Sequence, residues 1–255
     1  MSTCVFAIVA HPDDIEFGMA GTLVLLTEAG CEIHAMNVAS GSCGSVEHDA
    51  ETITRIRDEE ARNAVALIGA THHPPLVPDL DIFYDKEQLA RLGSIIREVA
   101  PDILLIPSPQ DYMEDHTNTS RLAVTAAFSR GMRNFPVDPP REPIDSDIAL
   151  YHAQPHGHVD QLNQPIIPDF VVAIDSVIDQ KEAMLAEHRS QKDWLDHSQG
   201  MDAYLITMRD LSRPMGDLVD ECKYAEGWRR HSPMGFGPGD YDPLPELLKD
   251  YIRRV

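Results

Sequence analysis

Residues that could bind a metal ion follow directly after the first apolar segment of the chain. The apolar residues 5–10 end in His-Pro-Asp-Asp at residues 11–14, so one imidazole and two carboxylates stand after a predicted buried strand. In an open α/β sheet, ligands bind beyond the carboxyl ends of the strands. Because zinc and similar metals take imidazole nitrogen and carboxylate oxygen as ligands, this position favours a metal site.

A further candidate ligand, His116, lies ten residues after another short apolar run at residues 103–106. In a doubly wound sheet, strands one and four can be neighbours where the strand order reverses and a crevice opens. Three protein ligands, here His11, Asp14 and His116, with one position open for water are typical of a catalytic zinc site. The adjacent Asp13 would then take the proton of that water, which is the chemistry of amide or ester hydrolysis.

The same residues have a simpler interpretation. An aspartate after a proline often caps a helix, and Asp13 or Asp14 could cap the helix predicted to begin near residue 17. A single histidine such as His116 is usually hydrogen-bonded without being a ligand. On spacing alone, the two interpretations are equally supported.

The negative net charge of the chain argues against polyanionic partners. The chain has 255 residues, a net charge of −21 and 43% hydrophobic residues. Nucleic acids and anionic membranes bind basic surfaces, so we expect neither as a partner. The apolar runs are far shorter than the roughly 18 residues of a membrane span, and the N-terminus has no signal-peptide pattern. The four cysteines show no CxxC spacing and are expected as reduced thiols in a cytoplasmic protein.

Apolar periodicity predicts strands that alternate with helices. The expected strands are residues 5–10, 33–39, 103–106, 148–152 and 170–174. The expected helices are residues 17–28, 52–68, 86–99, 122–132 with a start near 117, 177–187, 202–211 and 247–252. This alternation implies a Rossmann-like α/β fold, in which helices flank a mainly parallel sheet and the active site lies at the carboxyl ends of the strands.

The length fits one domain over residues 1–255. Residues 133–168 are rich in proline, which predicts long loops around a single strand, and such segments often form lids or binding loops. Residues 232–245 are rich in proline and glycine, and we expect the tail at 232–255 to wrap over the surface.

One string of residues resembles a known family. Ala-His-Pro-Asp-Asp-Ile-Glu at residues 10–16, followed by Gly18 and Gly21, is similar to the LmbE-like (PIG-L) family of zinc-dependent deacetylases. That family removes acetyl groups from N-acetylglucosamine-type amino sugars and conjugates. Further segments resemble it in order along the chain: residues 40–45, 56–61, 79–82, 115–116, 187–191 and 224–226.

The resemblance implies roles for individual residues. His11, Asp14 and His116 would bind one zinc ion, with another divalent metal such as iron as the alternative, and Asp13 would be the general base. Arg57 matches a position that can contact the sugar, although an ion pair with Glu60 on its own helix is the alternative.

The second metal motif departs from the family. It is commonly His-x-Asp-His, but here it reads Met113-Glu114-Asp115-His116, and methionine cannot donate a hydrogen bond. Tyr112 and His188 are the candidates to replace the missing histidine, Tyr112 by binding substrate and His188 as a catalytic residue.

The resulting expectation is a zinc-dependent hydrolase that deacetylates a small N-acetyl sugar or conjugate and that forms a homo-oligomer. One alternative is an amidase that acts on a thiol conjugate or a natural product. Another is a non-catalytic sugar- or nucleotide-binding module that uses the Gly/Ser loop at residues 40–45 as a phosphate cradle, although the loop lacks a GxGxxG or Walker pattern.

Overall fold

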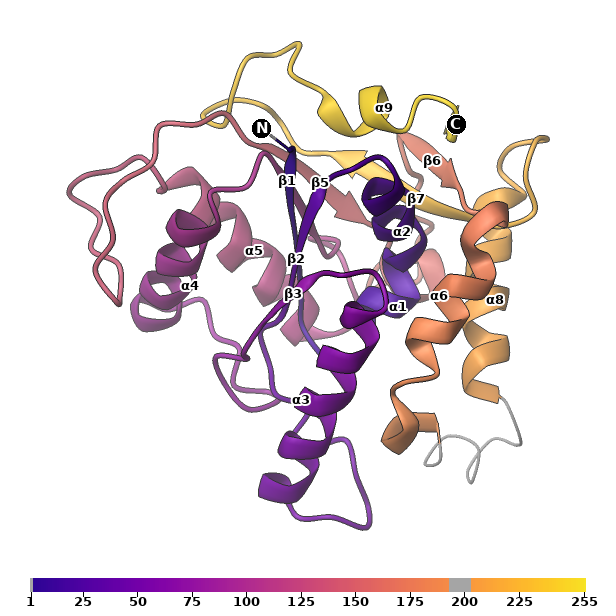
Figure 1. The fold of residues 1–255 in the computed structure, drawn as a ribbon, viewed down its shortest axis with the longest axis horizontal. Helices are drawn as coiled ribbons and strands as arrows, with labels where there is room; N and C mark the ends of the chain where they lie inside the picture. The colour runs from indigo at the N-terminus through magenta and orange to yellow at the C-terminus, as the bar shows by residue number, and fades with distance from the viewer. Residues whose placement is uncertain (1, 193–202) are drawn as a thin grey trace.

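A mixed sheet forms the centre of the computed structural model, which describes residues 2–192 and 203–255 (Figure 1). Within these residues the sheet has eight strands in the order β3-β2-β1-β4-β5-β7-β6-β8. The strands are β1 Cys4–Val9, β2 Glu32–Asn37, β3 Thr71–His73, β4 Ile103–Ile106, β5 Ala149–Ala153, β6 Phe170–Ala173, β7 Ala225–Arg230 and β8 Ile252–Arg254. Strands β1 to β5 are mutually parallel, whereas β7 runs antiparallel to β5 and β6, and β8 runs antiparallel to β6.

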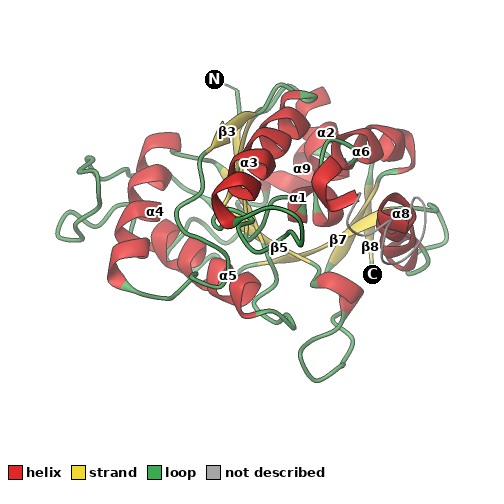
Figure 2. Cartoon of the chain, turned by 90° about the horizontal axis from the view of Figure 1, so that it is seen from below, coloured by secondary structure: helices red, strands yellow, loops and turns green. Residues whose placement is uncertain are grey.

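Helices cover both faces of the sheet. They are α1 Asp14–Gly18, α2 Ala20–Glu28, α3 Ala50–Ala66, α4 Lys86–Val99, α5 Glu114–Phe128, α6 Ile178–Leu185, α8 Ala203–Gly216 and α9 Pro243–Leu247. Figures 1 and 2 show α4 and α5 on one side of the strands and α2, α6 and α8 on the other. None of the described helices is long and apolar enough to cross a lipid bilayer.

The buried strand β1 supplies side chains to both cores. Val5, Ala7 and Val9 pack toward α2 and α6, and Phe6 and Ile8 pack toward α4 and α5. This alternation is the period of two that a strand imposes on its side chains. It explains why β1 is a continuous apolar run, since a parallel strand covered on both faces has no solvent-facing position.

The strand order reverses at β1, which pairs with β2 on one side and with β4 on the other. The loops that follow β1 and β4 therefore meet at the carboxyl edge of the sheet, where a crevice forms. The predicted α/β fold is confirmed, and α4 and β4 have the predicted bounds.

Some predicted elements differ from the structure. The helix predicted at residues 17–28 begins earlier, at Asp14, and is interrupted at Met19, whose φ of −151° is not helical. The helix predicted at 202–211 corresponds to α8, although Asp202 lies outside the described residues. The sequence analysis also missed β3 and β7, whose polar residues gave no strand signal.

The terminal helix predicted at residues 247–252 is wrong. A short helix occupies Pro243–Leu247, and the chain then forms the edge strand β8, which pairs with β6 through Val172 and Ile252. The tail is thus part of the sheet and not only a surface wrap. Its strand depends on a partner about 80 residues away in sequence, which local periodicity does not reveal.

A buried ion pair joins α6 to β7 on the face of the sheet that α2 covers. Lys181 Nζ lies 2.7 Å from Glu226 Oε1, and neither side chain is exposed. Glu226 accepts hydrogen bonds from the backbone N–H groups of Gly21 (2.9 Å) and Thr22 (2.7 Å), and Lys181 donates to the carbonyl of Phe17 (3.0 Å). The carboxylate lies at the N-terminus of α2, where the helix dipole favours negative charge. Glu226 of the segment at residues 224–226, which resembles the PIG-L family, therefore has a structural role.

Replacing this carboxylate will strongly destabilise the fold. Glu226→Ala leaves the Lys181 ammonium buried without its partner, which should lower the free energy of unfolding by about 3–5 kcal/mol. Denaturant titration measures the loss. The matched control is Glu98→Ala, which breaks the exposed pair with Arg141 and should change stability by less than about 1 kcal/mol. Equal effects of the two substitutions would contradict the assignment.

Acid will destabilise the protein through His152. Its Nδ1 donates to the carbonyl of Pro107 (2.9 Å) and its Nε2 faces His231 Nδ1 (2.9 Å), an arrangement that suits the neutral ring. Burial lowers the pKa of His152 to about 4. Between pH 6.5 and 4 the unfolded chain binds a proton that the folded chain does not, so stability falls as the pH falls, by up to about 3 kcal/mol. The His152→Asn variant should show a smaller loss of unfolding free energy from pH 7 to 4, and an equal loss would exclude His152 as the cause.

Candidate metal centre

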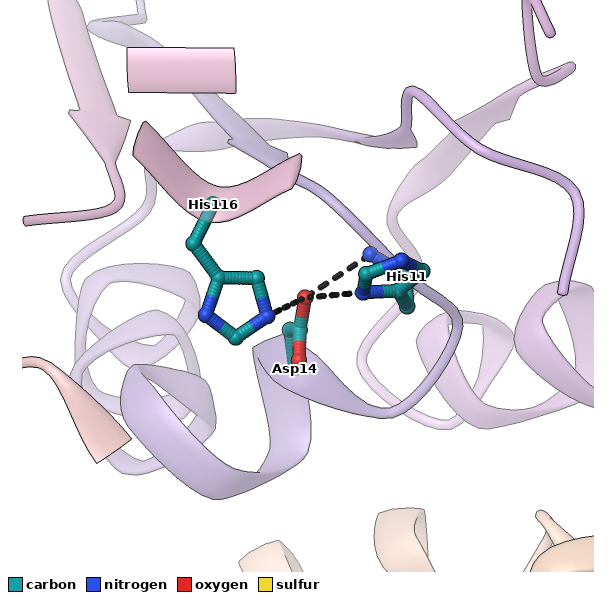
Figure 3. A group of neighbouring side chains, drawn as sticks. All are labelled: His11, Asp14 and His116. Carbon is teal, nitrogen blue, oxygen red and sulfur yellow. Dashed lines mark hydrogen bonds and ion pairs between the residues drawn. The ribbon is translucent and has the colours of Figure 1, made fainter. Parts of the chain in front are cut away.

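Three of the predicted site residues come together at the carboxyl edge of the sheet. His11 lies in the turn after β1, Asp14 begins α1, and His116 lies in the first turn of α5. Among the described residues, one ligand atom from each lies within 4.8 Å of the others. In Figure 3 the interactions converge on a single oxygen, Asp14 Oδ2, which is 3.6 Å from His11 Nδ1 and 3.4 Å from His116 Nε2.

These separations fit a divalent metal. Tetrahedral coordination with ligand bonds of about 2.0–2.1 Å places neighbouring ligand atoms roughly 3.3 Å apart, close to the distances between Asp14 and each imidazole. The set holds three protein ligands, which is the number that leaves an open position in a catalytic site. The donor atoms suit zinc and also ferrous iron.

Each imidazole is oriented by a second carboxylate. His11 Nε2 is hydrogen-bonded to Asp115 Oδ2 (2.9 Å), and His116 Nδ1 lies 3.0 Å from Asp111 Oδ1. Both carboxylates are almost fully buried. With one ring nitrogen so engaged, the other nitrogen of each histidine faces Asp14. This is the carboxylate–histidine arrangement that fixes the ring and strengthens its basicity toward a metal.

Each of the three candidate ligands shifts the pKa of its neighbours. Burial alone would lower the pKa of both histidines, but the surrounding carboxylates outweigh it and raise the pKa of His11 to about 9 and that of His116 to about 11. Burial likewise would raise the pKa of Asp14, but His116 and His11 hold it well below its ordinary value. Without metal, protons therefore occupy the site, and a metal would displace them on binding.

The neighbouring carboxylate, Asp13, has the opposite environment. Its φ of 101° places it in the left-handed region, which turns its side chain away from Asp14 and into the cavity. The hydroxyl of Tyr204 donates to Asp13 Oδ2 (2.7 Å), and Arg57 Nη2 lies 3.5 Å from the same oxygen. Burial raises the pKa of Asp13, opposed by the charge of Arg57 and reinforced by that of Asp14.

A cavity of about 500 Å³ opens in front of these residues. The three candidate ligands and Asp13 line it, together with Tyr112, Met113 and Leu80. Tyr112 is 57% exposed, and its ring centroid lies 6.0 Å from that of His116. The predicted substrate residue Tyr112 is therefore placed where a ligand can reach it.

Arg57 faces the cavity from α3 and does not pair with Glu60. Its Nη2 donates to the carbonyl of Pro12 (2.5 Å), whereas Glu60 accepts from the backbone N–H and the hydroxyl of Ser190. The alternative of an Arg57–Glu60 pair is thus wrong. Gly41, at φ 76°, lies directly against this side chain, and a Cβ there would be 2.6 Å from Arg57 Cδ.

A carboxylate engages two backbone amides of the Gly/Ser loop at residues 40–45. Asp79 accepts hydrogen bonds from the N–H groups of Gly41 (2.6 Å) and Cys43 (2.8 Å), so a carboxylate already occupies this part of the loop. The hydroxyl of Ser42 accepts from the N–H of Asp79 (3.1 Å). These contacts argue against a nucleotide-binding module that uses this loop as its cradle.

His188 lies behind the cavity and does not line it. The residue is fully buried, and its Nε2 is 3.1 Å from Glu16 Oε2. Burial would lower its pKa, but Glu16 outweighs burial and raises it. Asp13 and Arg57 lie within electrostatic reach of the ring. The predicted catalytic role of His188 stays a prediction, and the geometry favours a supporting position over contact with substrate.

Asp111 and Tyr204 were not predicted as site residues, and Asp115 was named only as part of the second metal motif. Asp111 and Asp115 carried no signal as histidine partners, because that role depends on where the rings point. Tyr204 belongs to α8, far from every other site residue in sequence, and reaches Asp13 only through packing of α8 against α1. An aromatic residue on a helix is ordinarily a core residue, so no local pattern distinguishes it.

Part of this chain matches a known protein family. Residues 6–127, slightly less than half of the chain, match the family model described as PIG-L, GlcNAc-PI de-N-acetylase. The matched region contains the metal triad, Asp13 and Arg57.

Individual proteins are similar to this chain over most of its length. It is 27% identical over 193 residues to the diacetylchitobiose deacetylase of Thermococcus kodakarensis, covering 73% of this chain and 69% of that protein. It is 28% identical over 184 residues to the 4-oxalmesaconate hydratase of Pseudomonas putida, covering 69% of each chain. The solved structure of N,N'-diacetylchitobiose deacetylase from Pyrococcus horikoshii shares the fold, with a TM-score of 0.77, 23% identity and coverage of 95% of this chain and 89% of that one.

Loss of a histidine partner will weaken metal binding. Asp115→Ala removes the carboxylate that orients His11 and should reduce zinc affinity about 10–100-fold, measured by competition with a chromogenic chelator. Glu114→Ala, at the exposed neighbouring position, is the matched control and should leave the affinity unchanged. The direct-ligand variant His116→Ala should lose stoichiometric zinc. Wild-type affinity in Asp115→Ala would show that the carboxylate does not support a metal ligand.

Proposed function

We propose that this protein is a metal-dependent hydrolase that removes the acetyl group from an N-acetylated amino sugar or glycoside. One observation carries the proposal: the adjacent carboxylates Asp13 and Asp14 are held in opposite states at one cavity. Asp14 joins two imidazoles in a ligand set, and Asp13 faces the same space with a raised pKa. Carboxylates whose environments separate their pKa values in this way take different roles in catalysis.

We assign the metal to His11 Nδ1, Asp14 Oδ2 and His116 Nε2, with one ion per chain. Zinc suits two imidazoles and a carboxylate, and iron is the alternative. When bound, the metal would act as a Lewis acid toward the amide carbonyl and would lower the pKa of water to about 7.

Asp13 is the proton carrier of the reaction. Its carboxylate accepts a proton from the attacking water and then donates that proton to the nitrogen that leaves, so one residue acts as base and as acid. A pKa raised by burial suits this double role better than the ordinary value of an aspartate. The hydrogen bond from Tyr204 and the nearby charge of Arg57 hold the carboxylate in place for both steps.

Met113 changes how the carbonyl oxygen is stabilised. It lines the cavity beside His116, where the resembling motif has a histidine, and its thioether donates no hydrogen bond. We assign this part of substrate binding to the Tyr112 hydroxyl on the cavity wall. We place the sugar in the outer cavity near Arg57, because the deacetylases among the relatives are named for acetylated sugars. The homo-oligomer and the cytoplasmic location stay predictions.

A second candidate is the hydration of a carbon–carbon double bond. A relative of similar identity is named a hydratase, and it matches 69% of this chain, against 73% for the diacetylchitobiose deacetylase. Hydration needs no acid for a leaving amine, and the site has Met113 where the family motif has an ionisable group. Arg57 would then pair with a substrate carboxylate. Release of an amine and loss of the ultraviolet absorbance of a conjugated dienoate distinguish the two reactions.

The experiment that tests the proposal measures free amine released from N-acetylglucosamine and diacetylchitobiose. Activity should disappear after chelation and return with zinc. Asp13→Asn should bind zinc like the wild type but lose about 10²-fold or more of kcat, because the amide accepts no proton. Full activity in zinc-loaded Asp13→Asn would remove Asp13 from the mechanism. No amine release from a zinc-loaded wild type on a panel of N-acetyl sugars would refute the deacetylase proposal.

A further inference from the structure

A second cavity lies behind the metal triad. Its volume is about 70 Å³, and it extends inward from Asp14 and His116 between α1, the end of β5, β7 and α8. It shares Asp14, Phe17, His116 and His156 with the outer cavity, so both open on the same reacting centre. The candidate ligand set therefore lies between two spaces, a larger outer one and a smaller inner one.

The walls of this inner cavity are mostly apolar. The side chains come from the strand ends, from the loop after β4 and from α8, and they include Val9, Met19, Pro107, Ala153, Leu211 and Met215. The charged pair Lys181–Glu226 contributes to the lining, but each charge satisfies the other. Such a lining favours an apolar group of a ligand over a sugar ring.

A polar region completes the inner cavity. Neither the nitrogen nor the oxygen of the Gln154 amide has a hydrogen-bond partner among the described residues, although both atoms are buried. His158 Nε2 lies 2.7 Å from the carbonyl of Leu211, so this nitrogen carries the hydrogen and Nδ1 is an acceptor. Nδ1 is also buried without a partner in the described chain. Buried polar atoms of this kind indicate that a ligand or water completes them.

We propose that the inner cavity is an acyl subsite, and that the protein hydrolyses N-acyl amino sugars whose acyl group is longer than acetyl and carries a hydroxyl or amide group. This inference rests on the proposed amide hydrolysis. The scissile carbonyl lies at the metal triad, the sugar occupies the outer cavity, and the acyl chain extends into the inner one. An acetyl methyl would fill only part of this space, because a water-sized group needs about 10–15 Å³ of such volume.

The reaction balances as an ordinary hydrolysis. Water adds to the acyl carbon, the carbon–nitrogen bond breaks, and the proton held by Asp13 passes to the nitrogen. The products are a free amino sugar and a carboxylic acid whose chain occupies the inner cavity. The polar group near the end of that chain would bond with Gln154 and His158.

A substrate series tests the inference on the zinc-loaded full chain. We expect kcat/KM to rise at least about tenfold from N-acetyl- to N-hexanoylglucosamine, because each buried methylene contributes favourably to binding. N-(6-hydroxyhexanoyl)glucosamine should be a still better substrate. A steady fall of kcat/KM with acyl length would overturn the inference while leaving the deacetylase proposal intact.

Two variants assign the effect to the cavity. Ala153→Leu fills the space and should lower the hexanoyl-to-acetyl ratio of kcat/KM at least tenfold. Gln154→Leu removes the amide at similar size and should abolish the preference for the hydroxylated chain. The matched control is Ala90→Leu on α4, on the opposite face of the sheet, which should leave both ratios unchanged. Unchanged ratios in folded Ala153→Leu would also overturn the inference.

A binding measurement separates this inference from the proposed function. The product analogues acetate, butanoate and hexanoate are titrated into the zinc-loaded protein by calorimetry. Hexanoate should bind at least tenfold more tightly than acetate. If no N-acyl sugar is hydrolysed but this order holds, the acyl subsite stands and the proposed hydrolase does not. Equal binding of acetate and hexanoate would overturn the acyl subsite, even if the Ala153→Leu variant does not fold.

Discussion

The carboxylate of Asp115 holds three separate segments of the site together. It is hydrogen-bonded to His11 in the turn after β1, 104 residues away, and it accepts the backbone N–H of Leu80 (2.8 Å) from the loop before α4. Leu80 has a φ of 65°, a conformation that an apolar residue rarely adopts without outside support. Because Asp115 lies in the first turn of α5, one buried side chain sets the direction of an imidazole and the position of the cavity wall.

The neighbouring carboxylates show how the fold gives different chemistry to like residues. Asp13 and Asp14 are adjacent on one turn, yet their charges are controlled by different elements. Two histidines stabilise the Asp14 anion, whereas Asp13 is buried beside Tyr204 from α8 and Arg57 from α3. The left-handed backbone at Asp13 separates the two side chains, so the candidate ligand Asp14 and the proposed proton carrier Asp13 reach the cavity in different orientations.

The reversal of strand order at β1 determines where both cavities lie. The outer cavity opens between the loops that follow β1, β2 and β4, and the inner cavity lies beneath, between α1, β7 and α8. The buried Lys181–Glu226 pair holds α1, α2, α6 and β7 around this inner space. The Lys181–Glu226 pair is satisfied by its own hydrogen bonds. In the described chain, Gln154 and His158 Nδ1 have no partner, so they can bond to a ligand in the inner cavity.

The sequence alone determined the local parts of this protein: the apolar strand β1, the turn with His11 and Asp14 after it, the helix α4, and the α/β class. These features depend on contacts between residues near in the chain, so their periodicity and turn chemistry are readable. Only the tertiary structure decided that Asp111 and Asp115 orient the histidines, that Tyr204 reaches Asp13, that Arg57 leaves Glu60, and that the tail forms β8. Each of these depends on segments distant in sequence, whose approach is set by packing of the whole sheet and its helices.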